Sequence, residues 1–139
     1  MLFNANDFLF YCVYVIMLLM KGEIRMLFLC YDKCSTCKKA EKKLNELNIQ
    51  FEKQSIIDHV PSKETLLEIL RSMDKPQKLF NTCGKKYREL DLKNKIKEMS
   101  LEQMADILST DGMLIKRPLL ITNQKVLIGY KEEEYEALK

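Results

Sequence analysis

The sequence has no tryptophan, a single histidine, and only four glycines and three prolines among its 139 residues. An all-β sandwich needs frequent turn residues, so this scarcity of glycine and proline argues against one. Neither sign of charge dominates, because the chain has 23 Lys and Arg and 20 Asp and Glu residues. The resulting net charge of +3 is too small to indicate a nucleic-acid-binding surface. A content of 47% hydrophobic and 31% charged residues excludes a disordered chain and predicts one globular domain.

The N-terminus also lacks the features of an exported protein. Residues 8–20 are an uninterrupted apolar run, but no Lys or Arg precedes it and no small-residue cleavage site follows. As a helix this run would span about 20 Å, less than the hydrocarbon core of about 30 Å. One interpretation is a weak membrane anchor, which Lys21 and Arg25 would orient with the main domain in the cytoplasm.

The other interpretation is that residues 1–25 do not belong to the working protein and that translation starts at Met26. Lys21-Gly22-Glu23 is what a purine-rich ribosome-binding sequence would encode, a short distance before Met26. We favour this interpretation. We therefore expect residues 1–25 to be an apolar extension outside the fold, and residues 26–139 to form the folded domain.

The first part of this domain has the pattern of a βαβ unit. Residues 26–31 are an apolar run typical of a buried strand, and apolar positions at helical spacing predict a helix from Thr36 to Leu47. Asn48 is a plausible end for that helix. Residues 49–57 predict the second strand.

The middle of the domain, from about residue 60 to 112, has helix signals and no strand signal. Ser62 is a predicted N-cap, and Ser100 with Gln103 forms a predicted capping box. We expect helices at 63–73, 87–97 and 101–108, with a short helical turn beginning at Pro76. This segment is interpreted as a helical insertion.

The end of the domain returns to β structure. Residues 119–122 and 125–128 predict a hairpin around a tight Asn123-Gln124 turn, and residues 131–138 predict a closing helix. The order of elements predicts an α/β fold with a small mixed sheet and a helical excursion.

Three of the five cysteines, Cys30, Cys34 and Cys37, lie within eight residues. Cys34-Ser35-Thr36-Cys37 is placed where the first strand leads into a helix, so unpaired backbone N–H groups and the helix dipole favour a thiolate. Cys34 is therefore the candidate nucleophile. Cys37, one helical turn further, could close a disulfide and release what Cys34 has bound.

Three alternative roles for the cysteines fit the sequence less well. Only Cys83 and His59 could complete a zinc site, and without the usual spacing. The spacing of Cys30, Cys34 and Cys37 occurs in iron–sulfur radical enzymes, but those need a barrel of about 200 residues or more. Inert packing does not fit a position at a helix start, except for Cys30, which we expect to pack inside the strand.

Arg117-Pro118 is the second informative pair. A proline can simply open a strand. The bond before it could instead be cis, which would place the Arg117 guanidinium beside the cysteine loop. An arginine there would bind oxyanions and stabilise a thiolate.

With these motifs the chain resembles the ArsC/Spx family of arsenate-reductase-like proteins on a thioredoxin fold. The resemblance covers residues 26–139 and rests on Cys34–Cys37 and on residues 80–90, 111–119 and 126–133. It implies a thioredoxin-like mixed sheet with an inserted helical subdomain and a cis-proline at Pro118. It places the nucleophile on Cys34 and the oxyanion-contacting arginine on Arg117. It further implies substrate contacts by Ser35, Thr36, Asn81, Arg117 and Pro118.

The resemblance implies a thiol–disulfide oxidoreductase in which Cys37 or glutathione resolves the adduct on Cys34. We expect a small thiol or oxyanion substrate, glutathione or thioredoxin as electron donor, and no bound metal or cofactor. We also expect a cytoplasmic monomer without direct contact to nucleic acid or membrane. The alternative is an Spx-type regulator that binds RNA polymerase and is switched by the Cys34–Cys37 disulfide.

Two positions depart from the glutathione-coupled arsenate reductases of this family. Asn81 stands in a segment where those enzymes have an arginine, which weakens the case for arsenate. Cys37 supplies a second motif cysteine that they usually lack. Cys83 stands where family members often have serine, and we interpret it as a loop spectator, with a second resolving thiol as the minority hypothesis.

Overall fold

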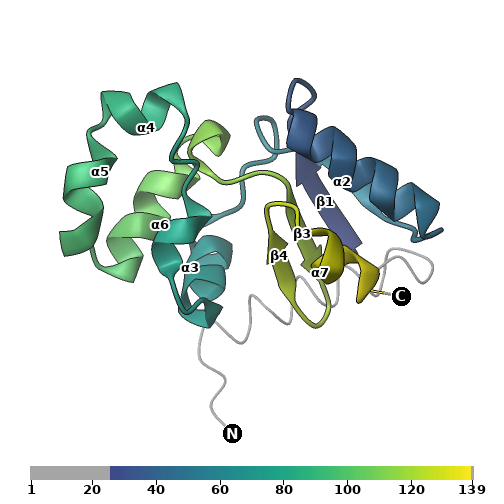
Figure 1. Cartoon of the computed structure of the whole chain (residues 1–139). Helices are drawn as coiled ribbons and strands as arrows, with labels where there is room; N and C mark the ends of the chain where they lie inside the picture. The colour runs from purple at the N-terminus through teal and green to yellow at the C-terminus, as the bar shows by residue number, and fades with distance from the viewer. Residues whose placement is uncertain (1–25, 139) are drawn as a thin grey trace, which may run out of the picture.

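A four-stranded mixed sheet forms one half of the protein in the computed structural model, which describes residues 26–138 (Figure 1). The strand order is β2 (Glu52–Ser55), β1 (Met26–Cys30), β3 (Leu119–Thr122) and β4 (Val126–Ile128). β1 runs parallel to β2 and antiparallel to β3, and β4 completes the hairpin with β3. The predicted N-terminal extension, residues 1–25, lies outside the described residues. Within residues 26–138, no helix is long and apolar enough to cross a membrane.

The predicted βαβ unit is confirmed, with α2 (Ser35–Glu46) connecting the two parallel strands. The second strand is shorter than the predicted range 49–57. Asn48 ends the helix in a left-handed conformation (φ 56°), and the Ile49 N–H still donates to the Leu44 carbonyl at 3.0 Å. Because this turn occupies the chain after α2, strand pairing begins only at Glu52, opposite Leu27.

The two faces of the sheet pack against different layers, because side chains alternate along each strand. Phe28 and Leu120 face α2 and the closing helix α7 (Glu132–Glu136), where they pack with Leu44 and Tyr135. Leu29 and Leu119 face the helical part that Figure 1 shows on the other side. The hairpin was predicted at the right residues, whereas α7 is shorter than the predicted range 131–138.

The helical part lies between β2 and β3 in the chain. Its elements are α3 (Lys63–Ser72), η1 (Pro76–Leu79), α4 (Lys85–Glu89), α5 (Leu92–Lys95), η2 (Ile96–Glu98), α6 (Leu101–Ser109) and η3 (Gly112–Leu114). Both predicted caps are confirmed. The Ser62 hydroxyl accepts from the Thr65 N–H at 3.2 Å, and Ser100 with Gln103 forms a capping box.

The predicted helix over residues 87–97 is wrong. The chain breaks at Asp91, which has a positive φ of 52°, and forms α4 and α5 instead of one helix. The buried residues explain the break. Tyr87 and Leu92 are five positions apart, which would put them on different faces of a continuous helix, whereas Leu92 and Ile96 share a face. The break allows all three to reach the core.

A short antiparallel pairing joins the helical part to the chain that leads into β3. The Asn81 N–H donates to the Leu114 carbonyl and the Lys116 N–H to the Leu79 carbonyl, both at 2.7 Å. Phe80 and Ile115 form the bridge between them. The residues that follow Ile115 are therefore held in place on the approach to the sheet.

Candidate functional site

The cysteine loop lies at the end of β1, where Cys34 is the N-cap of α2. The Cys34 N–H donates to the Tyr31 carbonyl at 2.9 Å, which closes the loop. The Cys34 Sγ accepts from the Cys37 N–H at 3.4 Å, in the place where a capping serine oxygen usually stands. The first turn of α2 contains no acidic residue, so nothing there offsets the positive end of the helix dipole.

Arg117 faces this loop from the segment before β3. Its guanidinium carbon lies 5.0 Å from the centre of the Tyr31 ring, and its Nη1 lies 3.2 Å from the Met113 Sδ. The Arg117–Pro118 peptide bond is cis, as the resemblance implied. Arg117 thus contacts the helical part through Met113 and the end of the first strand through Tyr31.

Arg117 and the helix start determine the ionisation of Cys34. Partial burial alone would raise the pKa of the Cys34 thiol, but the hydrogen bond from Cys37 and the nearby positive charge of Arg117 lower it overall. A thiol with a lowered pKa is ionised to a greater extent near neutral pH, and the thiolate is the attacking species.

The two buried cysteines behave in the opposite way. Burial raises the pKa of Cys37 to about 12, with a further contribution from its neighbour Cys34. Burial also raises the pKa of Cys30, whose thiol lies 3.8 Å from the Gln54 carbonyl. Cys30 and Cys37 are each only 3% exposed. The loop therefore pairs a thiolate-forming Cys34 with a protonated Cys37.

The other predicted site residues have different positions. Thr36 is half-buried and Ser35 exposed in the first turn of α2, while Pro118 is buried next to Arg117. The Asn81 side chain contacts η3, where its Nδ2 donates to the Met113 carbonyl at 3.2 Å. Its link to the site runs through Met113.

Cys83 is exposed in the loop between η1 and α4. Its backbone carbonyl accepts from the Arg88 Nη1 at 3.4 Å. Within residues 26–138, no group of three or more His, Cys, Asp and Glu side chains could hold a metal ion.

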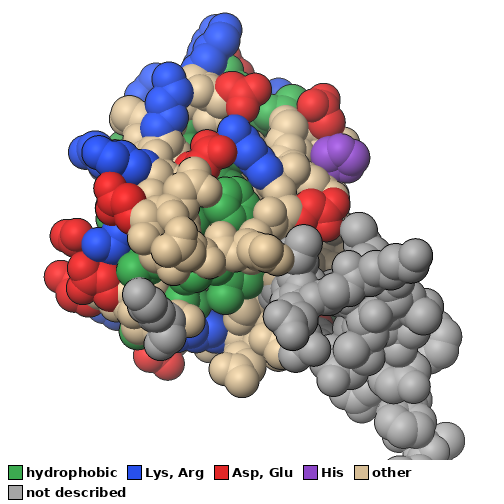
Figure 2. Space-filling view, turned by 90° about the vertical axis from the view of Figure 1, so that its right-hand side faces the viewer, with side chains coloured by type: hydrophobic (Ala, Val, Ile, Leu, Met, Phe, Trp, Pro, Cys, Tyr) green, Lys and Arg blue, Asp and Glu red, His purple; other side chains and the backbone are tan. Residues whose placement is uncertain are grey.

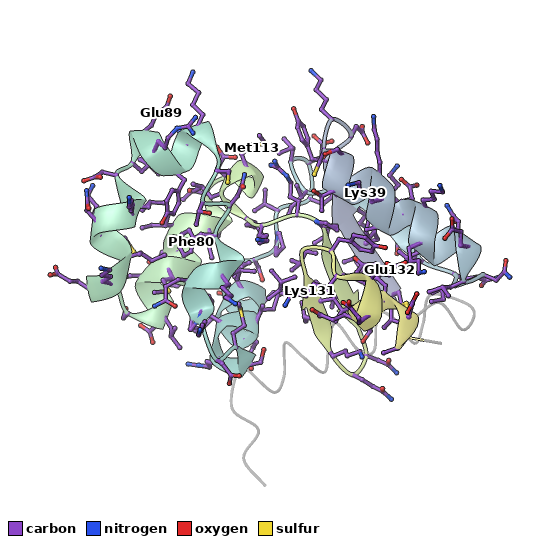
Figure 3. All side chains as sticks on the ribbon, viewed as in Figure 1. Lys39, Phe80, Glu89, Met113, Lys131 and Glu132 are labelled. Atoms are coloured by element: carbon purple, nitrogen blue, oxygen red, sulfur yellow. The ribbon has the colours of Figure 1, made fainter. Side chains whose placement is uncertain are left out.

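Sequence reasoning did not identify Tyr31 or Met113 as site residues. The sequence pattern predicts Tyr31 as the end of a strand, and Met113 belongs to one of the segments on which the family resemblance rests. The signal was available for Tyr31, since an aromatic residue three positions before a motif cysteine lies in the same loop. Nothing in the local pattern places Met113, because its contact with Arg117 depends on how η3 folds back toward the sheet (Figure 3).

The surface around the start of α2 is basic. Lys33, Lys38 and Lys39 are all exposed there. Figure 2 shows most of the Lys and Arg side chains of this face in its upper half, the end at which α2 begins. Positive charge near the loop favours an anionic sulfur and the approach of anionic molecules.

Tyr135 packs in the same core cluster as Cys37 and is fully buried. Its hydroxyl has no hydrogen-bond partner among residues 26–138, and burial raises its pKa. Burying a hydroxyl without a partner costs about 1–3 kcal/mol. We therefore expect Tyr135→Phe to raise the free energy of unfolding by about 1 kcal/mol in chemical denaturation.

The control for this prediction is Tyr130→Phe. The Tyr130 ring stacks edge-on against Tyr135 at 5.0 Å, but Tyr130 is only half-buried. Loss of its hydroxyl should change the stability by less than about 0.5 kcal/mol. A Tyr135→Phe protein less stable than the wild type would mean that the hydroxyl has a partner.

The sequence profile of the ArsC family matches residues 29–138. Over 110 residues the chain is 44% identical to the uncharacterized protein YusI of Bacillus subtilis, covering 78% of this chain and 93% of that protein. It is 28% identical to the global transcriptional regulator Spx of Streptococcus mutans, covering 75% of each chain. The crystal structure of a possible arsenate reductase from Streptococcus mutans superposes with a TM-score of 0.75 at 38% identity, covering 78% of this chain and 93% of the other.

Proposed function

The chain belongs to the ArsC family, and we propose that within this family it is a thiol–disulfide oxidoreductase with Cys34 as the nucleophile. One observation carries the proposal. The Cys34 sulfur accepts a hydrogen bond from the start of α2, and the guanidinium of Arg117 lies over the ring of Tyr31, whose carbonyl accepts from the Cys34 N–H. This combination favours a thiolate at a half-exposed position, as a redox-active cysteine requires.

The reaction begins with attack of the Cys34 thiolate on one sulfur of a disulfide substrate. A bond forms between Cys34 and that sulfur, the substrate S–S bond breaks, and the second substrate sulfur leaves as a thiolate. Cys37 then loses its proton to the leaving thiolate or to water and attacks the Cys34 sulfur. This step forms the Cys34–Cys37 disulfide and releases the other half of the substrate. Two electrons pass from the two protein thiols to the substrate.

The raised pKa of Cys37 fits a thiol that reacts in the second step. Its pKa is raised first by burial and then by the neighbouring Cys34. Once Cys34 has become a neutral mixed disulfide, the repulsion between two sulfur charges is gone, and Cys37 ionises more easily. Cys37 is therefore a poor nucleophile in the free protein and a better one after the first step.

Arg117 would stabilise the thiolate before attack and bind an anionic group of the substrate after it. An arginine presents five N–H donors in a planar fork, and the Met113 contact leaves others available. We propose a disulfide or oxyanion substrate of small size, with glutathione or thioredoxin returning the electrons. In the glutathione route a second thiol takes the place of Cys37.

The alternative function is a redox-switched regulator that binds RNA polymerase. It is favoured by the similarity to Spx and by the presence of both motif cysteines. In that case the Cys34–Cys37 disulfide would change the affinity for the partner, and no substrate would turn over.

A trapping experiment tests the enzyme hypothesis. In Cys37→Ser, an adduct on Cys34 cannot be resolved within the protein, so we expect mixed disulfides to accumulate when the variant is exposed to a cell lysate or to oxidised glutathione. They are detected as a mass increase that dithiothreitol reverses. Cys34→Ser is the matched control and should trap nothing at the cysteine loop, because it keeps Cys37 but lacks the attacking thiolate. Fragment ions assign each adduct to its residue, so an adduct on the exposed Cys83 is not counted.

Two results would count against the enzyme hypothesis. One is equal trapping by Cys37→Ser and Cys34→Ser, which would locate the reactive thiol elsewhere. The other is noncovalent recovery of RNA polymerase subunits together with no trapped adduct and no turnover of a disulfide substrate, which would favour the regulator.

A further inference from the structure

The Arg117 guanidinium contacts two groups from different segments, close to the cysteine loop. The Tyr31 ring follows β1, and the Met113 thioether comes from η3 in the chain that leaves the helical part. The carbonyl of Tyr31 accepts from the Cys34 N–H at 2.9 Å, so the guanidinium lies over the loop that holds Cys34. Figure 3 shows Met113 on the side of the helical part that faces the sheet. The contact with Met113 is a hydrogen bond of 3.2 Å from the Arg117 Nη1 to the Met113 Sδ.

Arginine needs such contacts to act at one defined point. Its long side chain carries about 2 kcal/mol of rotamer entropy, so a guanidinium without fixed partners would occupy many orientations. The Tyr31 ring attracts the guanidinium, whose carbon lies 5.0 Å from the ring centre, but this attraction leaves the group free to slide and turn over the ring. A directional contact at one nitrogen removes that freedom.

A thioether suits this role because it is a neutral and weak acceptor. A carboxylate at the same place would bind Arg117 more strongly, but it would also cancel the positive charge that stabilises the Cys34 thiolate. Met113 can therefore orient the guanidinium and leave its charge available to Cys34.

Met113 is itself fixed at both backbone ends. Its N–H donates to the Asp111 Oδ1 at 2.9 Å, and its carbonyl accepts from the Asn81 Nδ2 at 3.2 Å. The thioether thus extends from a backbone that is anchored to its own turn and to the loop after η1. This gives Asn81 an indirect place in the site, through the backbone of Met113.

We propose that Met113 is a positioning residue, whose thioether holds the Arg117 guanidinium beside the Cys34 sulfur. The helical part of the chain then sets the reactivity of a cysteine that belongs to the sheet. The functional meaning of this inference rests on the proposed role of Cys34 as the attacking thiolate, but the contact itself can be tested without any substrate.

The test measures how the alkylation rate of Cys34 by iodoacetamide depends on pH. Met113→Leu keeps the apolar volume but removes the acceptor, so we expect the midpoint of the profile to move to higher pH and the rate at pH 6 to fall about two- to fivefold. Met113→Gln places an amide oxygen near the same point and should restore most of the rate. Met113→Glu should give the slowest alkylation of the three, because it also neutralises Arg117.

A double-mutant cycle with Arg117→Leu separates positioning from a structural effect. If Met113 acts through Arg117, Met113→Leu changes the profile only when Arg117 is present. An unchanged midpoint in Met113→Leu, or equal shifts with and without Arg117, would overturn the inference. Thermal unfolding of each variant verifies that the profiles are measured on folded protein.

The outcome is also separable from the proposed function. A midpoint that responds to Met113 only through Arg117, in a protein that reduces no disulfide and traps no adduct, would uphold the positioning role and refute the enzyme hypothesis. Adduct trapping by Cys37→Ser, together with an alkylation midpoint that does not change in Met113→Leu, would support the enzyme hypothesis and refute the positioning role.

Discussion

Iodoacetamide at pH 7 is expected to alkylate Cys34 of the reduced protein at least about thirtyfold faster than Cys37. With a pKa of about 12, Cys37 is ionised to about one part in 10⁵ at this pH, whereas the pKa of Cys34 lies below its ordinary value of 9.0, so that about 1% or more is thiolate. The fraction of thiolate thus differs about a thousandfold between the two cysteines. A thiolate of higher pKa is intrinsically more nucleophilic, which offsets about thirtyfold of this difference and leaves about thirtyfold in favour of Cys34. Cys37 is also only 3% exposed, which slows the reagent further.

Tandem mass spectrometry provides the measurement. Both cysteines fall in the tryptic peptide that follows Lys33 and ends at Lys38, so fragment ions assign the label at early times. Cys83, on an exposed loop, serves as the internal reference for access of the reagent. Equal initial rates at Cys34 and Cys37 would show that burial does not separate the two thiols, and the order of steps proposed for them would then have no basis.

Cys34 and Cys37 differ in pKa for two reasons, of which only one can be predicted from the sequence. The position of Cys34 at a helix start could be read from the strand and helix patterns on either side of it, and the structure has that helix beginning at Ser35. The burial of Cys37 depends on Tyr135 and Leu127, which pack over the same face from the other end of the chain. No local pattern around Cys37 reports such a contact.

In the fold, too, features that depend on neighbouring residues could be predicted, whereas those that depend on distant contacts could not. Caps and the hairpin turn were predictable because their hydrogen bonds join residues a few positions apart, as in the contacts of Ser62 and Ser100. The break at Asp91 was missed because it is imposed by the core that Tyr87 and Leu92 must both reach. Helical periodicity alone could not show that the chain has to turn there.

The site depends on one further long-range contact, between the backbones of Gly112 and Ile56. A Cβ at Gly112 would lie 2.1 Å from the Ile56 carbonyl oxygen and 2.8 Å from its carbon. These are backbone atoms next to the end of β2, and the Ile56 N–H donates to the Cys30 carbonyl at 2.9 Å. Neither side of the contact can therefore move without displacing a strand end or the turn that carries Met113.

Gly112→Ala is accordingly expected to lower the free energy of unfolding by about 3 kcal/mol or more, or to prevent folding. The backbone of Gly112 is not left-handed, so alanine could adopt its conformation, and the smaller entropy of the unfolded alanine chain would even favour folding by up to about 1 kcal/mol. Overpacking a core costs typically 1–3 kcal/mol and occasionally more. We expect the upper end of this range or beyond it, because the overlapping Ile56 atoms belong to the backbone and cannot rotate away as a side chain can.

Gly84→Ala is the matched control. Its Cβ would first meet a side-chain atom, the Asn81 Nδ2 at 2.9 Å, which can rotate away, and the nearest backbone atom, the Asn81 carbonyl oxygen, lies at 3.2 Å and not at 2.1 Å as for Gly112. We expect Gly84→Ala to cost less than about 1 kcal/mol in chemical denaturation, although some loss of the Asn81–Met113 hydrogen bond will accompany it. In any Gly112→Ala protein that folds, the loop bearing Met113 and Arg117 must shift relative to the cysteines, so alkylation of Cys34 at pH 6 should also slow. A Gly112→Ala protein as stable as the wild type, with an unchanged Cys34 profile, would mean that η3 does not rest on the end of β2, and the path by which the helical part reaches Cys34 would have to lie elsewhere.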